Sequence, residues 1–343
     1  MKALLNTLFV TNPHSYLALE GGNVLVKHEE EIVGRVPLQN LEQIVTFGYA
    51  GASPRLMYAC TERNIAISFH SRNGKLLARV IGESRGNVVL RKSQYRLSDD
   101  EQASCLIARN IITGKIFNQR WVLERVTRDH ALRIDVPLFK KISKELAEAV
   151  KLSQQTTDLE ILRGVEGQAA SRYNSLFNQM ILQQKEHFTF NGRSRRPPLD
   201  NVNAMLSFAY TLLGNDVAAA LEAVGIDAYV GFLHRDRPGR ASLALDMMEE
   251  LRSIYADRFV LTLINKKVIT KADFVTKENS AVLMTDDARK KFIASWQERK
   301  TTKIEHPYLK EKISWGLVPY TQALLLARFI RGDLDQYPPF LWK

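Results

Sequence analysis

The sequence predicts an α+β protein of two domains, a small N-terminal domain resembling a β-sandwich and a larger C-terminal domain that is all α-helical. Three observations predict this class. Over roughly the first 85 residues, short apolar runs alternate with period two, as in strands. After Gly86 the apolar residues recur at every third and fourth position, as in helices. The length of 343 residues is enough for two hydrophobic cores. The expected boundaries are 1–86 for the β domain, 87–98 for a linker and 99–343 for the helical domain.

Turn residues divide the N-terminal region into strands. Gly21–Gly22 and Asn73–Gly74 are strong hairpin signals, because glycine adopts positive φ without steric cost. Pro54 suits the first turn of a short helix over 54–64, where its missing N–H would have no helical partner. The expected strands cover 15–20, 23–27, 31–37, 41–47, 65–70 and 75–81.

Capping residues mark the helices of the second domain. Ser98–Glu101, Thr156–Asp158 and Asp200 offer side-chain oxygens to free N–H groups at helix starts, and Pro197–Pro198 interrupts the chain before one of them. The expected helices cover 101–128, 137–153, 158–185, 200–224, 242–257, 286–300 and 306–332.

Composition excludes several classes of protein. A hydrophobic share of 45% and a charged share of 25% argue against disorder, collagen and coiled-coil rods. Only Cys60 and Cys105 are present, too few for a disulfide framework or a cysteine-built zinc finger. We find neither a run of ~18 apolar residues nor a signal-peptide cleavage site, so no membrane association is expected and the protein should be cytoplasmic.

The charge balance favours a polyanionic partner. Lys plus Arg total 48 against 37 for Asp plus Glu, which gives a net charge of +11. Basic surfaces bind nucleic acid by neutralising phosphates and releasing counterions. The plainer interpretation is a basic protein that is merely soluble.

Glu166 is the first candidate for chemistry. It lies in an apolar helical pattern beside Gly164 and Gly167, small residues that would let another backbone or a ligand come close. Taken alone, it is better explained as a surface residue.

His234 and the acidic residues after it form the second candidate group. His234 ends the apolar run VGFL, and Asp246, Glu249 and Glu250 follow on one predicted helix. A buried structural histidine and a salt-bridged helix surface are the alternatives. Together, however, one imidazole and two carboxylates (Glu166 and an acid near 249) suit Mg²⁺ or Mn²⁺ with open coordination positions. Such a metal polarises phosphoryl oxygens and activates hydroxyl nucleophiles.

Arginines surround the histidine loop. Arg235, Arg237 and Arg240 lie within six positions of His234, where cations would hold a scissile phosphate. The alternative for this cluster is a solvated surface.

At these residues the sequence resembles the CRISPR-associated spacer-acquisition integrase and endonuclease family, the universal adaptation nuclease. The tail and the length are most similar to its type I, subtype C branch. The segment around His234 is the most specific. The similar segments, in chain order, are NLEQIVTFG, ERNIAISFHSRNGKLLARV, VEGQAASRYN, RRPPLDNVNAMLSFAYTLL, GFLHRDRPGRASLALDMMEELR and RGDLDQYPPFLWK.

The resemblance implies roles for particular residues. Glu166, His234 and Glu249 match the catalytic ligands of Mg²⁺ or Mn²⁺, and Asp246 should lie close by as a supporting or DNA-positioning group. Arg240 and Arg252 are weaker candidates for phosphate contacts, with Arg235 and Arg237. The alternative for Arg252 is a structural ion pair with Glu249 or Glu250.

The resemblance also implies an activity and partners. Family members are homodimers through the β domain, and a small CRISPR-associated adaptor protein bridges two dimers. The complex joins the 3′-hydroxyl ends of a double-stranded prespacer to the CRISPR repeat by transesterification. An iron–sulfur nuclease that trims prespacers is a further candidate partner. Two alternatives remain: a freestanding metal-dependent nuclease for branched or repair-intermediate DNA, with water as nucleophile, and a non-catalytic nucleic-acid scaffold.

Overall fold

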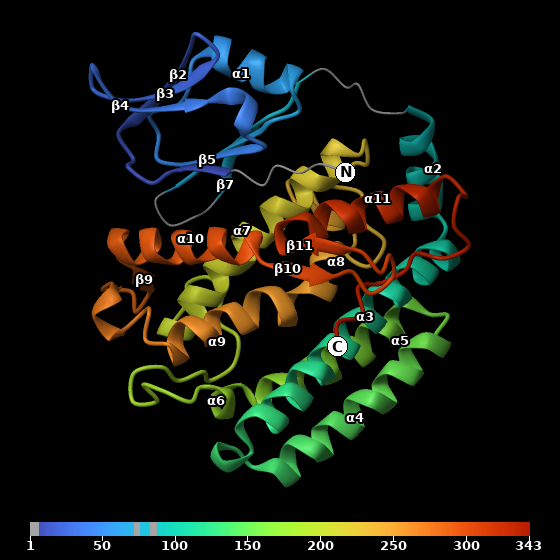
Figure 1. Cartoon of the computed structure of the whole chain (residues 1–343). Helices are drawn as coiled ribbons and strands as arrows, with labels where there is room; N and C mark the ends of the chain where they lie inside the picture. The colour runs from blue at the N-terminus through green and yellow to red at the C-terminus, as the bar shows by residue number, and fades with distance from the viewer. Residues whose placement is uncertain (1–6, 72–75, 83–87) are drawn as a thin grey trace. The chain divides into compact units, whose positions relative to one another are not determined.

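The computed structural model describes residues 7–71, 76–82 and 88–343 and divides into two compact units (Figure 1). The N-terminal unit comprises Met1–Arg85, Met284–Thr302 and Trp315–Leu317. The helical unit comprises Gly86–Leu283, Lys303–Ser314 and Val318–Lys343. The predicted class, a strand-rich N-terminal region followed by a helical one, is confirmed. The predicted hairpin signal at Asn73–Gly74 falls outside the described residues.

Two sheets make up the N-terminal unit. One is a four-stranded mixed sheet, in which β7 is antiparallel to β6 and the other pairs are parallel. The other is an antiparallel meander whose first hairpin turns at Gly21–Gly22, as predicted. Strand β1 was not among the expected strands. The first sheet has the order β1 (Thr7–Val10), β5 (Gln43–Phe47), β6 (Ala66–His70), β7 (Leu76–Val80), and the second β2 (Ser15–Glu20), β3 (Asn23–His28), β4 (Glu31–Pro37).

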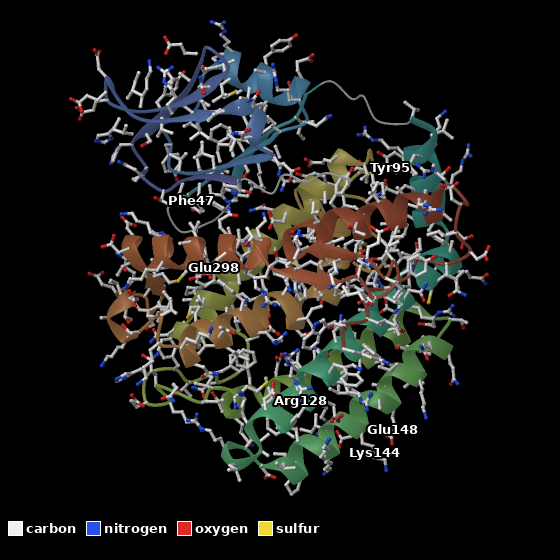
Figure 2. The ribbon with its side chains drawn as sticks, viewed as in Figure 1. Phe47, Tyr95, Arg128, Lys144, Glu148 and Glu298 are labelled. Carbon is white, nitrogen blue, oxygen red and sulfur yellow. The ribbon has the colours of Figure 1, made fainter. Side chains whose placement is uncertain are left out.

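Apolar side chains from both sheets and from α1 (Pro54–Glu62) form one core in this unit. Leu17, Ile44 and Leu56 are fully buried in it. Phe47, labelled in Figure 2, lies in β5 with its ring 6.5 Å from that of Phe9. Burial of such side chains is the main stabilising term for a small sheet domain.

Helix α10 (Asp286–Thr301) belongs to the N-terminal unit, although the sequence placed 286–300 in the helical domain. Its Gln297 side chain donates a hydrogen bond of 3.4 Å to the backbone oxygen of Thr7, on β1. Its Trp296 is fully buried. Because these contacts join residues nearly 300 positions apart, no local sequence pattern indicates them.

The expected linker at 87–98 is instead almost entirely helical, as α2 (Val88–Asp99). Tertiary contacts within the helical unit explain this helix. The buried side-chain amide of Gln94 donates to the backbone oxygens of Asp227 and Val230, at 2.8 and 2.9 Å. The Tyr95 hydroxyl, labelled in Figure 2, donates to Asp227 at 2.9 Å.

Most helices of the helical unit lie where the sequence predicts them along the chain. Aspartates cap several helix starts, including Asp158 and Asp200 as predicted, and Asp100 caps α3. Helices α3, α4 and α5 pack side by side (Figure 1). Besides α2, its described α-helices are α3 (Glu101–His130), α4 (Val136–Gln155), α5 (Leu159–Ser175), α6 (Phe177–Met180), α7 (Asn201–Ala223), α8 (Ser242–Leu251), α9 (Arg258–Asn265) and α11 (Val318–Ile330).

Several details differ from the predicted helices. The expected helix 158–185 is shorter, because α5 ends at Ser175 and only the one-turn α6 follows, as far as Met180. The expected helix 306–332 begins only at Val318, after a hairpin of β10 (Lys303–Glu305) and β11 (Lys312–Ser314). The expected helix 242–257 becomes a π-helix over its last six residues, η3 (Arg252–Asp257). The two remaining short strands are β8 (Phe274–Thr276) and β9 (Val282–Met284).

Helix α7 is long and apolar enough to span a membrane by length and composition, contrary to the expectation that no such stretch exists. Its most apolar window is, however, 67% buried inside the protein. The helix is therefore well explained as a core helix of the helical unit.

Candidate active site

Two helices and a loop of the helical unit bring the three predicted ligands to one cavity. Glu166 lies on α5, Glu249 on α8, and His234 on the loop that joins α7 to α8. All three line a cavity of about 500 Å³. The other lining residues are Glu160, Arg163, Leu233, Arg235 and Arg240. Residues 68 and 15 positions apart thus face the same space.

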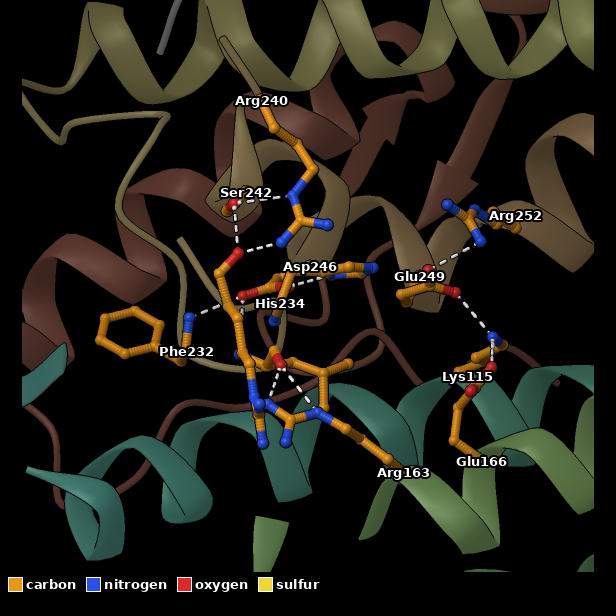
Figure 3. A network of polar contacts seen from close by, with 12 residues as sticks. Lys115, Arg163, Glu166, Phe232, His234, Arg240, Ser242, Asp246, Glu249 and Arg252 are labelled. Atoms are coloured by element: carbon orange, nitrogen blue, oxygen red, sulfur yellow. Dashed lines mark hydrogen bonds and ion pairs between the residues drawn. The ribbon is translucent and has the colours of Figure 1, made fainter. Parts of the chain in front are cut away.

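A lysine that the sequence analysis did not select lies between the two carboxylates. The ammonium group of Lys115, on α3, forms ion pairs with Oε1 of Glu166 and, at 2.7 Å, with Oε2 of Glu249 (Figure 3). The Lys115 side chain is only 7% exposed. The Lys115 ammonium group therefore links α3 to both α5 and α8 through ion pairs.

Glu249 is held ionised by its neighbours. Its side chain is 4% exposed, and its Oε1 lies 2.7 Å from Nη1 of Arg252. Burial alone would raise its pKa, but the positive charges of Arg252 and Lys115 outweigh burial and lower the pKa to about 2. Arg252 therefore forms the structural ion pair that the sequence analysis named as its alternative role.

Asp246 organises the histidine loop. This fully buried carboxylate accepts backbone hydrogen bonds from Phe232 at 2.7 Å, Leu233 at 2.9 Å and His234 at 3.1 Å (Figure 3). It also contacts Nδ1 of the His234 ring at 2.5 Å. With Nδ1 engaged, Nε2 is the ring atom left for a ligand, and a carboxylate behind a histidine is the usual support of a metal-binding imidazole.

Position 231 has room only for glycine, whereas Gly164 and Gly167, the small residues noted beside Glu166, have open space around them. A Cβ on Gly231 would lie 2.8 Å from Oδ2 of Asp246 and 2.9 Å from Cβ of Ser242. A Cβ on Gly164 or Gly167 would meet nothing within 4 Å, so no neighbouring backbone packs against them. We expected these glycines to let another backbone or a ligand come close; among the described residues no backbone does so, and the approach of a ligand stays a prediction.

The donor set fits a divalent metal chemically. Oε2 of Glu249 is a buried oxygen without a hydrogen bond in the described structure, and a cation already lies between the two carboxylates. Two carboxylates and one imidazole suit Mg²⁺ or Mn²⁺. Among the described residues, however, no three His, Cys, Asp or Glu side chains are already close enough to hold a metal ion.

The predicted phosphate-binding arginines divide into groups. Arg235 and Arg240 line the cavity, and the Arg235 side chain contacts Glu160 at 2.5 Å. Arg240 donates to the backbone oxygen of Arg235. Arg237 is exposed and is not among the lining residues. Arg163, on α5, also lines the cavity, although the sequence analysis overlooked it.

Glu250, next to Glu249, faces away into the core. Its carboxylate accepts hydrogen bonds from the Tyr337 hydroxyl at 2.5 Å and the Phe340 backbone N–H at 2.8 Å. Burial raises its pKa to about 7, against these hydrogen bonds, which lower it. The two adjacent glutamates therefore differ in role: one lines the cavity, and the other anchors the C-terminal segment to α8.

Comparison with known proteins identifies the family. Residues 8–298 match the family model described as CRISPR associated protein Cas1. A CRISPR-associated endonuclease Cas1 from Chlorobaculum tepidum is 47% identical over 343 residues, which cover all of both chains.

Solved structures share the fold. A casposase bound to integration product superposes with a TM-score of 0.83 at 22% identity, over 98% of this chain and 93% of that one. The Cas6-RT-Cas1–Cas2 complex gives a TM-score of 0.82 at 23% identity, over all of this chain and 36% of that longer one. On the family match and the full-length relative, the chain belongs to the Cas1 family of CRISPR-associated proteins.

Proposed function

We propose that the chain is a divalent-metal-dependent DNA integrase with endonuclease activity, which joins the 3′-hydroxyl ends of a prespacer duplex to the CRISPR array. The observation that carries the proposal is the pair of acidic side chains, Glu166 and Glu249, which two helices bring to one cation beside His234. The endonuclease name of the Chlorobaculum relative and the integration product bound by the casposase support it.

The proposed reaction is a transesterification. The prespacer 3′-oxygen forms a new bond to a phosphorus atom of the array and loses its proton. The bond from that phosphorus to its former 3′-oxygen breaks, and that oxygen gains a proton. A Mg²⁺ or Mn²⁺ ion held by Glu166, His234 and Glu249 would polarise the phosphate and favour the ionised hydroxyl.

The chain's own residues prepare this site. Asp246 fixes the ring of His234, and Arg252 fixes one oxygen of Glu249, so that neither ligand needs to be ordered when substrate binds. Arg163, Arg235 and Arg240 give the cavity wall positive charge, which suits phosphate oxygens.

The proposed partners follow from the same assignment. They are double-stranded prespacer and repeat DNA, a second copy of the chain bound through the N-terminal unit, and a small adaptor between two such dimers. A solved structure that contains Cas1 together with Cas2 supports the adaptor. The iron–sulfur trimming nuclease and a cytoplasmic location are also part of the proposal.

Strand transfer of a labelled 3′-hydroxyl duplex into a repeat-containing plasmid tests this function. With Mn²⁺ we expect Glu166→Ala and His234→Ala to reduce joining by about 100-fold or more, because each removes a ligand of the activating cation. Glu145→Ala is the matched control, since Glu145 pairs with Arg172 and does not line the cavity. Joining at the normal rate by both site variants would contradict the proposal. Cleavage without any joining would favour the freestanding nuclease.

A further inference from the structure

We propose that Lys115 is a positioning residue, a resident cation that holds Glu166 and Glu249 together until a divalent metal takes its place. The inference rests on the proposed metal site and adds a role for a residue that is not one of its ligands. Its basis is the arrangement of one ammonium group between two carboxylates from different helices.

The burial of Lys115 requires an explanation. A lysine that is 95% buried is costly unless its charge is paired. Its only ion-pair partners among the described residues are Glu166 and Glu249. Conversely, these two carboxylates approach one cation and would repel each other without it. The ammonium therefore stabilises the closed arrangement of α3, α5 and α8 when no metal is bound.

The two oxygens of Glu249 have different surroundings. Oε1 is 2.7 Å from Nη1 of Arg252. The Cζ atom of this guanidinium group also lies over the Tyr210 ring, 5.3 Å from the ring centroid. Among the described residues, the charged partner of Oε2 is the Lys115 ammonium group, at 2.7 Å. One oxygen is thus fixed to the core, whereas the other is held by a contact that a different cation can replace.

It follows that Lys115 and the metal compete for the same two carboxylates. A positive charge at this position opposes the binding of a second cation, and coupling between two such binding events is reciprocal. Removing the ammonium should therefore strengthen metal binding and weaken the metal-free fold. A lysine that merely filled the core would have only the second effect.

The test is calorimetric titration of Mn²⁺ into metal-stripped protein, with melting temperatures in EDTA and in excess Mn²⁺. We expect Lys115→Met to bind Mn²⁺ about tenfold more tightly than the wild type, which is within the usual range of coupling between sites. Its melting temperature in EDTA should fall, and Mn²⁺ should raise it by more than in the wild type. Lys115→Gln, which keeps a polar group, is the second variant in case the first does not fold.

Lys140→Met is the matched control. Lys140 forms an ion pair of 2.6 Å with Glu124 on the same helix bundle, but its side chain is 55% exposed and does not line the cavity. This variant should leave Mn²⁺ affinity unchanged. Mn²⁺ affinity that is unchanged or weaker in both Lys115 variants would overturn the inference. Failure of the metal site itself is distinguishable, because wild-type protein and Glu166→Ala would then give the same titration.

Discussion

Asp246 shows how one buried side chain organises the loop that carries His234, close to the site as the family resemblance implies. Its carboxylate accepts hydrogen bonds from three consecutive backbone N–H groups, those of residues 232–234, and contacts the His234 ring. The loop can approach this carboxylate because residue 231 has no Cβ. An acid placed among such donors keeps the imidazole in one orientation without itself touching substrate.

Gly231→Ala tests this dependence at the residue scale. The added Cβ would lie 2.8 Å from the Asp246 carboxylate, so the loop must shift and His234 with it. We expect Mn²⁺ affinity to fall by about 10-fold to 100-fold, as when the support of a ligand is lost. Calorimetry provides the measurement. Gly164→Ala, where the added methyl meets open space, should leave the affinity unchanged; equal effects of the two substitutions would refute this account of the loop.

The sequence indicates the side chains that could bind a metal more readily than it indicates the residues that form ion pairs with them. The sequence predicts Glu166, His234 and Glu249 because imidazole and carboxylates suit one class of metal, and the family resemblance indicates which acids belong to the set. Lys115 was overlooked, since a single lysine in a long helix, 51 residues from Glu166, has no local signature. Its role depends on the packing of three helices, which sequence periodicity does not specify.

At the scale of elements, period and capping predicted most helices, but tertiary contacts decided where some of them end. The pattern over 242–257 is continuous, yet the last six residues form the π-helix η3 (Arg252–Asp257). Single-turn π segments are frequent at functional sites. Here the segment begins at Arg252, which pairs with Glu249, and ends at Asp257, which accepts a 2.5 Å hydrogen bond from Tyr210.

Asp257 gives this element a predictable pH dependence. Burial raises its pKa from 3.8 to about 6, although the Tyr210 hydrogen bond, Arg252 and Arg193 act in the opposite direction. The folded state therefore binds more protons than the unfolded state between these values. Its contribution to stability is complete below pH ~4 and is lost as the pH rises through about 6, an effect of roughly 3 kcal/mol.

In the wild type, protonation of Asp257 should make the free energy of unfolding increase as the pH falls from 7 to 4. The Asp257→Asn variant cannot bind this proton, so this increase should be smaller in the variant. Urea unfolding at several pH values measures it. Asp287→Asn is the control, because that side chain is 82% exposed. Parallel profiles for wild type and Asp257→Asn would show that the aspartate does not titrate in this range.

At the scale of the whole molecule, the change of hydrophobic period near Gly86 predicted a strand-rich region followed by a helical one. The same signal cannot show that 284–302 returns to the N-terminal unit, since Gln297 and Thr7 meet only in three dimensions. The net charge of +11 is a property of the entire chain and agrees with a nucleic-acid substrate. Composition therefore favours the class of partner that we propose, and packing brings the proposed site residues together.

The most direct test of the central claim is anomalous diffraction from crystals grown with Mn²⁺. We predict one anomalous peak per chain bound by Glu166, Glu249 and Nε2 of His234, with the Lys115 ammonium displaced from at least one carboxylate. A fully occupied Mn²⁺ peak elsewhere, with Lys115 still paired to both glutamates, would contradict the account.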